Sequence, residues 1–212
     1  MTVRSVVLLL FAVLAHAVVI DRIAILVNGK IIKQSDIDRD TRVTEFLNRE
    51  RLNLSAGTRK AAANRLIDQV FIRGDLELGS YPEATLSDAD RELDLIKAQR
   101  YPNSAAFNRV LASYGLTQLD LRTEFQWQLT VLSFIDRRFK PAAVVSDEEI
   151  QKYFAEHHAA LERANPGKTA LDDFRQQIEN TLSGEKVNQL FFSWLDEQRK
   201  QAKIQYLEEG FE

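Results

Sequence analysis

The sequence predicts a mainly α-helical, multi-helix protein with a small β-sheet that joins the two ends of the chain. The helices are predicted from a series of capping residues, each followed by apolar side chains at helical spacing. The sheet is predicted from two short segments of strand character, Ile23–Val27 near the start and Ile204–Glu208 near the end. Because strands this short are not stable alone, we expect these two segments to pair with each other.

The first element is expected to be a hairpin. In the stretch DRIAILVNGKIIKQSDIDRD, residues 21–40, the dipeptide Asn28-Gly29 separates two short apolar runs and favours a tight turn. A helix start follows at once, with Ser35 as the expected capping residue and Asp38 at the third helical position.

The later helices are predicted from capping residues at their starts and from glycine or proline at their ends. The expected boundaries are Ser55 or Thr58 to Gly79, Ser87 with Asp90 to Tyr101-Pro102, Ser104 to Gly115, Thr117 with Asp120 to Pro141, a start at Ser146 with Glu149, and a long closing helix over residues 170–203.

The helix predicted at about residues 118–139 has apolar side chains on two different faces. Such a helix is either buried on both sides, as a central core helix, or lines a groove, and both interpretations stay open here. One stripe contains Leu121, Phe125, Leu129, Leu132, Ile135 and Phe139, and the other contains Trp127, Val131 and Phe134.

Composition excludes several classes of function. The 212 residues are 45% hydrophobic and 28% charged, as in an ordinary globular protein. The net charge of −3 is spread along the chain without a basic block, so we predict no nucleic-acid binding. The chain contains no cysteine, which rules out disulfides, thiol catalysis and a lipoprotein anchor.

Residues 1–17 are predicted to be a secretory signal peptide. Arg4 supplies the positive charge, VVLLLFAVL supplies the apolar segment, and Ala15-His16-Ala17 forms a cleavage site. We expect cleavage after Ala17, which removes one positive charge and makes the net charge about −4. The alternative is an uncleaved membrane anchor, because the apolar run continues to Ile20.

No catalytic, metal or cofactor site is predicted. The two histidines beyond the predicted cleavage site, His157 and His158, are adjacent and therefore do not share a helix face. The tripeptide GKT at 167–169 lacks the preceding glycine-rich frame of a phosphate loop, so we predict no nucleotide binding. We therefore expect a binding protein that uses no cofactor.

Two motifs, one at each end of the chain, resemble those of the SurA-type periplasmic chaperones, a family related to PpiD and PrsA. The first is similar to the N-terminal signature V-D-R-I-x-x-x-V-N-x-x-x-I-x-x-S-D-[ILM], and the second to the closing signature W-L-x-x-x-R-x-x-A-x-I. The matching residues are Val19 or Ile20, Asp21, Arg22, Ile23, Val27, Asn28, Ile32, Ser35, Asp36 and Ile37, then Trp194, Leu195, Arg199, Ala202 and Ile204.

The resemblance implies a chaperone core without its usual enzyme domains. Members of the family carry parvulin prolyl-isomerase domains, each on the order of 90 residues, before the closing helix. Here the corresponding interval, residues 157–168, is long enough for a linker alone. We expect one chaperone core over residues 18–212, made of 18–156, this linker, and a closing helix and strand over 169–212.

The resemblance also implies a function and a location. We expect an ATP-independent holdase in the periplasm, which binds unfolded exported polypeptides such as outer-membrane β-barrel precursors. Extended segments would lie in a groove between helices. The expected contact residues are large apolar side chains, for which ordinary packing between helices is the alternative: Tyr101, Phe107, Tyr114, Trp127, Val131 and Phe134.

Three alternatives stay open. The chain could be an anchored or secreted module that binds one folded partner. It could be a prolyl isomerase, although no catalytic set is evident. The closing strand could also complete the sheet of a neighbouring copy across the segment 162–169, which would give a domain-swapped homodimer.

Overall fold

The computed structural model describes residues 21–208, 210 and 211, so the predicted signal peptide and its cleavage site lie outside the described residues. In the described part of the chain, seven α-helices and one three-stranded sheet confirm the predicted fold class. The elements are β1 (Ile23–Val27), β2 (Lys30–Lys33), α1 (Gln34–Asn48), α2 (Ala56–Gly79), α3 (Leu86–Arg100), α4 (Ser104–Ser113), α5 (Gln118–Phe139), the 3₁₀ turn η1 (Lys140–Ala142), α6 (Asp147–Ala164), α7 (Leu171–Gln201) and β3 (Ile204–Tyr206).

The sheet pairs the two ends of the chain, as predicted. Its order is β2-β1-β3, with both pairings antiparallel. Asn28 and Gly29 both have positive φ, which is the conformation that the tight turn between β1 and β2 requires. Asn28 also binds the other end of the chain. Its backbone N–H donates to the Lys203 carbonyl at 3.0 Å, and its side-chain oxygen accepts from the Lys203 N–H at 2.8 Å.

Several predicted helix starts are displaced by one or two residues. The helices α5 and α6 begin after Thr117 and Ser146, as predicted, with Asp120 and Glu149 completing the caps. By contrast, α3 is capped by Thr85 with Asp88, because the chain turns into the helix two residues before Ser87. In the same way α1 begins after Lys33, and α4 is capped by Asn103 instead of Ser104.

Ser35 and Gly79 have other roles than those predicted. Ser35 lies inside α1, where its hydroxyl donates to Asp21 at 2.5 Å and ties the chain before β1 to the helix. The left-handed residue at the end of α2 is Ser80 and not Gly79. A Cβ on Gly79 would lie 2.2 Å from the ring of Tyr81, so glycine leaves the space that this ring occupies.

The interval 157–168, predicted as a linker, is helical up to Ala164. The connection to α7 is therefore a short turn around Pro166 and Gly167, with Gly167 at positive φ.

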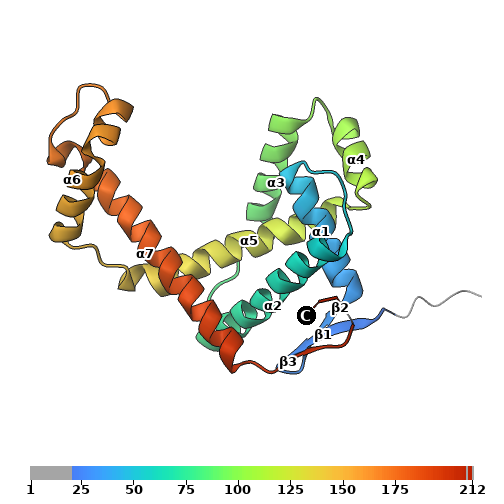
Figure 1. The fold of residues 1–212 in the computed structure, drawn as a ribbon. Helices are drawn as coiled ribbons and strands as arrows, with labels where there is room; N and C mark the ends of the chain where they lie inside the picture. Colours follow the sequence, from blue (N-terminus) through green and yellow to red (C-terminus); the bar gives the residue numbers. More distant parts are fainter. Residues whose placement is uncertain (1–20, 209, 212) are drawn as a thin grey trace, which may run out of the picture.

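Three apolar clusters stabilise different parts of the molecule. The central core packs the sheet against α2, the end of α5 and the end of α7. The upper core joins α1, α3, α4 and the start of α5. The third cluster lies between α6 and the first half of α7. We call these two segments the arm, and the cluster the arm core. Figure 1 shows the result, in which the long α7 runs from the arm with α6 down to β3, and α5 crosses between the arm and the upper core.

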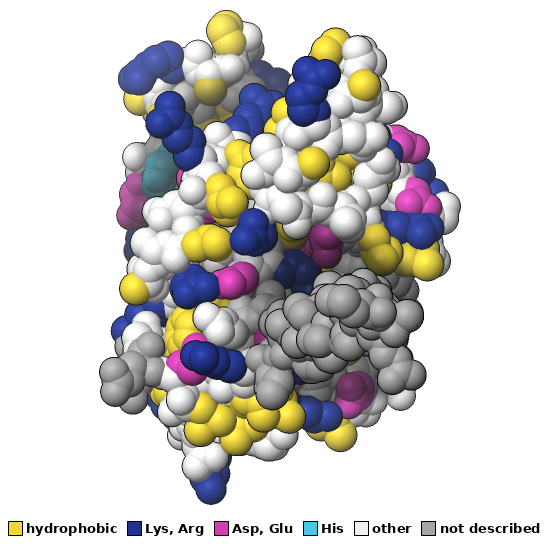
Figure 2. All heavy atoms as spheres, turned by 90° about the vertical axis from the view of Figure 1, so that its right-hand side faces the viewer, with side chains coloured by type: hydrophobic (Ala, Val, Ile, Leu, Met, Phe, Trp, Pro, Cys, Tyr) yellow, Lys and Arg dark blue, Asp and Glu magenta, His cyan; other side chains and the backbone are white. Residues whose placement is uncertain are grey.

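None of the described helices is long and apolar enough to span a membrane. On the face shown in Figure 2, the described Lys and Arg side chains are interspersed with acidic and apolar ones and form no continuous basic surface.

Candidate functional site

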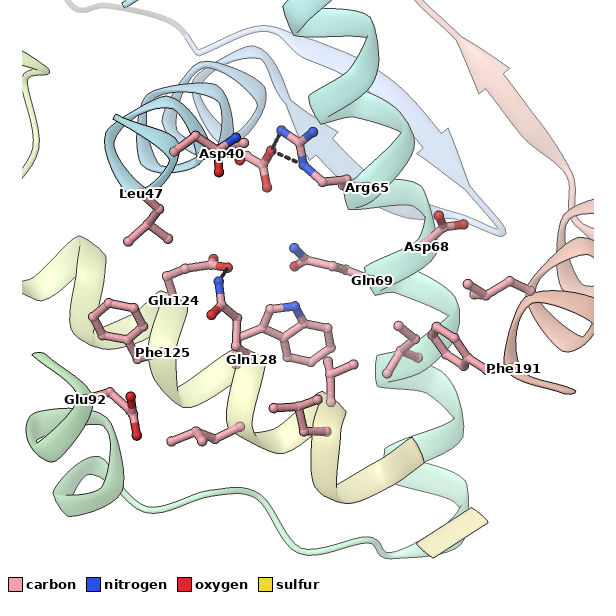
Figure 3. A pocket seen from close by; sticks show the side chains of 18 of the residues that line it. Asp40, Leu47, Arg65, Asp68, Gln69, Glu92, Glu124, Phe125, Gln128 and Phe191 are labelled. Carbon is pink, nitrogen blue, oxygen red and sulfur yellow. Dashed lines mark hydrogen bonds and ion pairs between the residues drawn. The ribbon is translucent and has the colours of Figure 1, made fainter. Parts of the chain in front are cut away.

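A groove of about 890 Å³ lies between α1, α2, α3, α5 and α7. Figure 3 shows its walls, with α5 below, α2 on one side and α1 and α3 on the other. The largest share of the side chains that carry its apolar surface comes from α5, and the rest come from the facing helices. Among them are Leu47, Ile96, Trp127, Val131, Leu132 and Phe192.

The helix α5 can line this groove because it is apolar on two faces. Some side chains from both faces enter the cores, where Leu121, Phe134 and Phe139 are buried. The side chains of Trp127 and Val131, which are half-buried, turn to the groove together with Leu132. Each face therefore contains both kinds of side chain: Trp127 lies on the same face as buried Phe134, and Leu132 lies on the same face as buried Leu121. Both interpretations of the two-faced helix apply, at different positions along its length.

Two large apolar side chains stand exposed at the groove. Leu132 on α5 is 63% exposed and Phe192 on α7 is 60% exposed. Such side chains cost free energy in water unless a ligand covers them, so their position in a groove indicates a binding surface.

The groove also has a polar section, built on α1, α2 and α5. Asp40 is almost fully buried, and its carboxylate accepts two hydrogen bonds from the Arg65 guanidinium, at 2.9 Å and 2.5 Å. Burial raises the pKa of Asp40, and the charge of Arg65 opposes that rise in part. Burial likewise raises the pKa of Glu124, whose carboxylate accepts a hydrogen bond from Gln128 at 2.8 Å.

The ring of Trp127 is in contact with the cationic side chain of Arg73. The Arg73 guanidinium lies 3.9 Å from the centre of the Trp127 ring, a cation–π contact. Burial lowers the pKa of Arg73 below its usual value, against the opposing charges of Glu83, Glu124 and Glu77. This contact orients the Trp127 ring, which also lines the groove.

Two of the six predicted contact residues lie in the groove: Trp127 and Val131. Phe107 and Phe134, by contrast, do not lie in the groove. They are 0% and 1% exposed and belong to the upper and central cores, respectively. The ring of Phe134 makes edge contacts with Tyr81 and Phe139, so it cannot reach a ligand in this conformation.

Tyr101 and Tyr114 are half-buried against the upper core, outside the groove. Each ring packs edge-on against a core phenylalanine, Tyr101 on Phe107 and Tyr114 on Phe46. The Tyr114 hydroxyl donates to the Glu50 carbonyl at 2.5 Å, which anchors it to the end of α1. Their positions match the packing alternative.

Sequence reasoning missed the exposed pair and the polar section. The stripe that contains Leu132 was left open between core and groove, although the charged Asp136, which follows Leu132 by four residues on the same side of the helix, is a sign of exposure. The adjacent Phe191-Phe192 carried the clearer signal, since neighbouring residues on a helix cannot share a face and one of the two must point away from the core. The structure buries Phe191 and exposes Phe192.

No group of three or more potential metal-ligating side chains occurs among the residues that the structure describes. His157 and His158 bind backbone oxygens instead, those of Tyr153 and Thr169 at 2.9 Å and 3.1 Å.

Comparison with known proteins places the fold. No protein-family model matches the sequence, and no curated protein matches it. Among solved structures, the chain is similar to one from a study of the virulence factor PEB4 and the periplasmic protein Cj1289, described as two structurally related SurA-like chaperones of Campylobacter jejuni. The TM-score is 0.53 at 13% sequence identity, over 88% of this chain and 99% of the other. The protein therefore has a SurA-like chaperone fold.

Proposed function

We propose that the protein is an ATP-independent holdase chaperone that binds unfolded polypeptides in the groove between α1, α2, α3, α5 and α7. The observation that carries this proposal is the groove itself, which exposes the large apolar side chains Leu132 and Phe192 within a SurA-like fold. An unfolded segment that covers these side chains removes apolar surface from water.

The groove also offers hydrogen bonds to a peptide backbone. Gln69 points into it from α2 (Figure 3), and its amide makes no side-chain hydrogen bond to any other described residue. An extended client has unpaired N–H and C=O groups, and an amide can both donate and accept. Backbone contacts of this kind do not depend on client sequence, as a general holdase requires.

We place the protein in the periplasm, with outer-membrane β-barrel precursors as clients. The predicted signal peptide supports export, and one of the two proteins in the comparison study is described as periplasmic. Mass spectrometry of the purified protein tests the export step, since cleavage after Ala17 leaves a chain that begins at Val18.

Suppression of aggregation tests the function. An unfolded β-barrel outer-membrane protein is diluted from denaturant into buffer without ATP, and light scattering is followed with and without the purified protein. We expect suppression near a stoichiometric ratio. The double variant Leu132→Ser with Phe192→Ser should weaken it several-fold by removing apolar surface from the groove.

A matched control separates the groove from general surface hydrophobicity. Leu78 on α2 and Leu95 on α3 are also exposed leucines on helices, but they lie outside the groove. The variant Leu78→Ser with Leu95→Ser should suppress aggregation as the unmodified protein does. Equal loss in both variants, or no suppression by the unmodified protein, would contradict the proposal.

Acceleration of prolyl isomerisation in a short peptide would contradict the absence of enzyme activity that we propose. The assay compares the relaxation rate of the peptide with and without the protein, since the uncatalysed step takes on the order of tens of seconds at 25 °C.

A further inference from the structure

The charged side chains of the groove are unevenly paired. Asp40 is bound to Arg65, and Asp68 is bound to Arg199 at 2.7 Å. Arg100 donates to the Leu47 carbonyl at 3.1 Å. Two carboxylates remain for which the described residues supply no ion pair: Glu92 on α3 and Glu124 on α5.

These two carboxylates border the apolar surface of the groove, Glu124 in the polar section on α5 and Glu92 on α3. Figure 3 shows Glu92, Phe125 and Glu124 along one side of the pocket, with Leu47 nearby. Both glutamates are half-buried. The contact that the structure gives the Glu124 carboxylate is the amide of Gln128, a neutral donor on the same helix.

A half-buried carboxylate without a cation is costly, and a cationic ligand removes that cost. The burial of Glu124 already shows in its raised pKa, since the charges of Arg65 and Arg73 act on it from beyond ion-pair distance and compensate only in part. A Lys or Arg side chain can lay its aliphatic stem on apolar surface and place its charged end on a carboxylate. The groove supplies both surfaces next to each other.

We propose that the groove selects extended polypeptide segments in which apolar side chains flank a lysine or arginine, whose cationic end pairs with the carboxylate of Glu124 or with that of Glu92. This inference rests on the proposed function and adds a charge preference to it. Segments with an acidic residue at the same place are disfavoured, because a third carboxylate would enter a site that already holds two unpaired ones.

Peptide binding measured by fluorescence anisotropy tests the preference. Short labelled peptides share one apolar sequence and differ at a central position, which is Lys, Gln or Glu. We expect the Lys peptide to bind about tenfold more tightly than the Gln peptide, and the Glu peptide to bind more weakly than both. Replacing both groove carboxylates, Glu92→Gln with Glu124→Gln, should abolish the difference between the Lys and Gln peptides.

The control variant removes the same charge elsewhere. Glu156 on α6 and Glu179 on α7 are exposed residues of the arm. Glu156→Gln with Glu179→Gln should keep the Lys preference. Loss of the preference in this control would mean that overall charge causes it, and would overturn the inference.

The outcomes distinguish this inference from the proposed function. Equal binding of all peptides to the unmodified protein overturns the charge preference and leaves the holdase intact. Absence of binding by every peptide contradicts the holdase and the preference together. Because the peptide series is measured on the unmodified protein, these results do not depend on how the variants fold.

Discussion

Phe134 and Leu132 are two residues apart on α5 and have opposite environments. Phe134 is 1% exposed and packs against the rings of Tyr81, Phe139 and Trp194, while Leu132 stands in the groove. A difference of two positions turns a side chain by about 200° around a helix, so a core residue and a binding residue can be near neighbours in sequence.

The variant Phe134→Ala should reduce the free energy of unfolding by about 3–5 kcal/mol, because it leaves a cavity among tightly packed aromatic side chains. Denaturant-induced unfolding, followed by tryptophan fluorescence, measures the change. The neighbouring variant Leu132→Ala should have a much smaller effect. Similar losses in the two variants would show that Phe134 does not hold the central core as the structure indicates.

At the level of the elements, β3 links the two ends of the chain. It pairs with β1 from Ile25↔Tyr206 to Val27↔Ile204, and the Leu207 N–H extends the pairing to the Ala24 carbonyl at 2.8 Å. Beyond the strand, Phe211 is 6% exposed and belongs to the central core. In the structure this closing strand completes the sheet of its own chain.

Truncation after Lys203 should therefore lower the melting temperature of the whole central core, since β1 loses its second partner and the core loses Phe211. Thermal unfolding by circular dichroism measures this. The single variant Phe211→Ala should show part of the loss, which separates the contribution of the side chain from that of the strand. An unchanged melting temperature after truncation would contradict this role of β3.

On the scale of the whole molecule, the arm is the least strongly packed part. Its core has four buried residues, compared with sixteen in the central core, so local unfolding should begin there. The arm is also fastened by a titratable contact, in which Lys186 on α7 binds Glu149 at the start of α6 at 2.7 Å.

Acidification should loosen the arm first. The hydrogen bond from Lys186, followed by that from the Ser146 N–H, lowers the pKa of Glu149 below its usual value of 4.5. A carboxyl group whose pKa is lower in the folded state stabilises the fold above its unfolded pKa, and this stabilisation is lost as the pH falls below about 4.5 through the folded pKa. Hydrogen exchange of α6, corrected for the intrinsic rate, should therefore rise on acidification more than that of α2.

The variant Glu149→Gln provides the test, because it should loosen α6 near neutral pH and weaken the further pH dependence. Glu156→Gln removes a charge from the same helix without touching α7, and it should leave the exchange pattern unchanged. If α6 exchanges equally in the unmodified protein and in Glu149→Gln over this pH range, the contact does not fasten the arm.

The sequence by itself determined the order and type of the elements and the pairing of the two ends. Capping pairs such as Thr117 with Asp120, and the turn at Asn28-Gly29, act over a few residues, so they can be recognised without a structure. The prediction of Ser87 as the cap of α3 failed because the chain enters the helix two residues earlier, at Thr85, and that depends on the path of the chain before the helix.

The tertiary structure alone decided which apolar side chains form the groove. Periodicity identifies the faces of a helix but not the neighbour that covers each face, so Trp127 and Phe134 appeared equivalent in sequence. Phe134 is buried against the rings of Tyr81 and Trp194, whereas Leu132 and Phe192 remain exposed in the groove. The unpaired Glu92 and Glu124 were invisible for the same reason, because the pairing of a charge depends on residues that are distant in the chain.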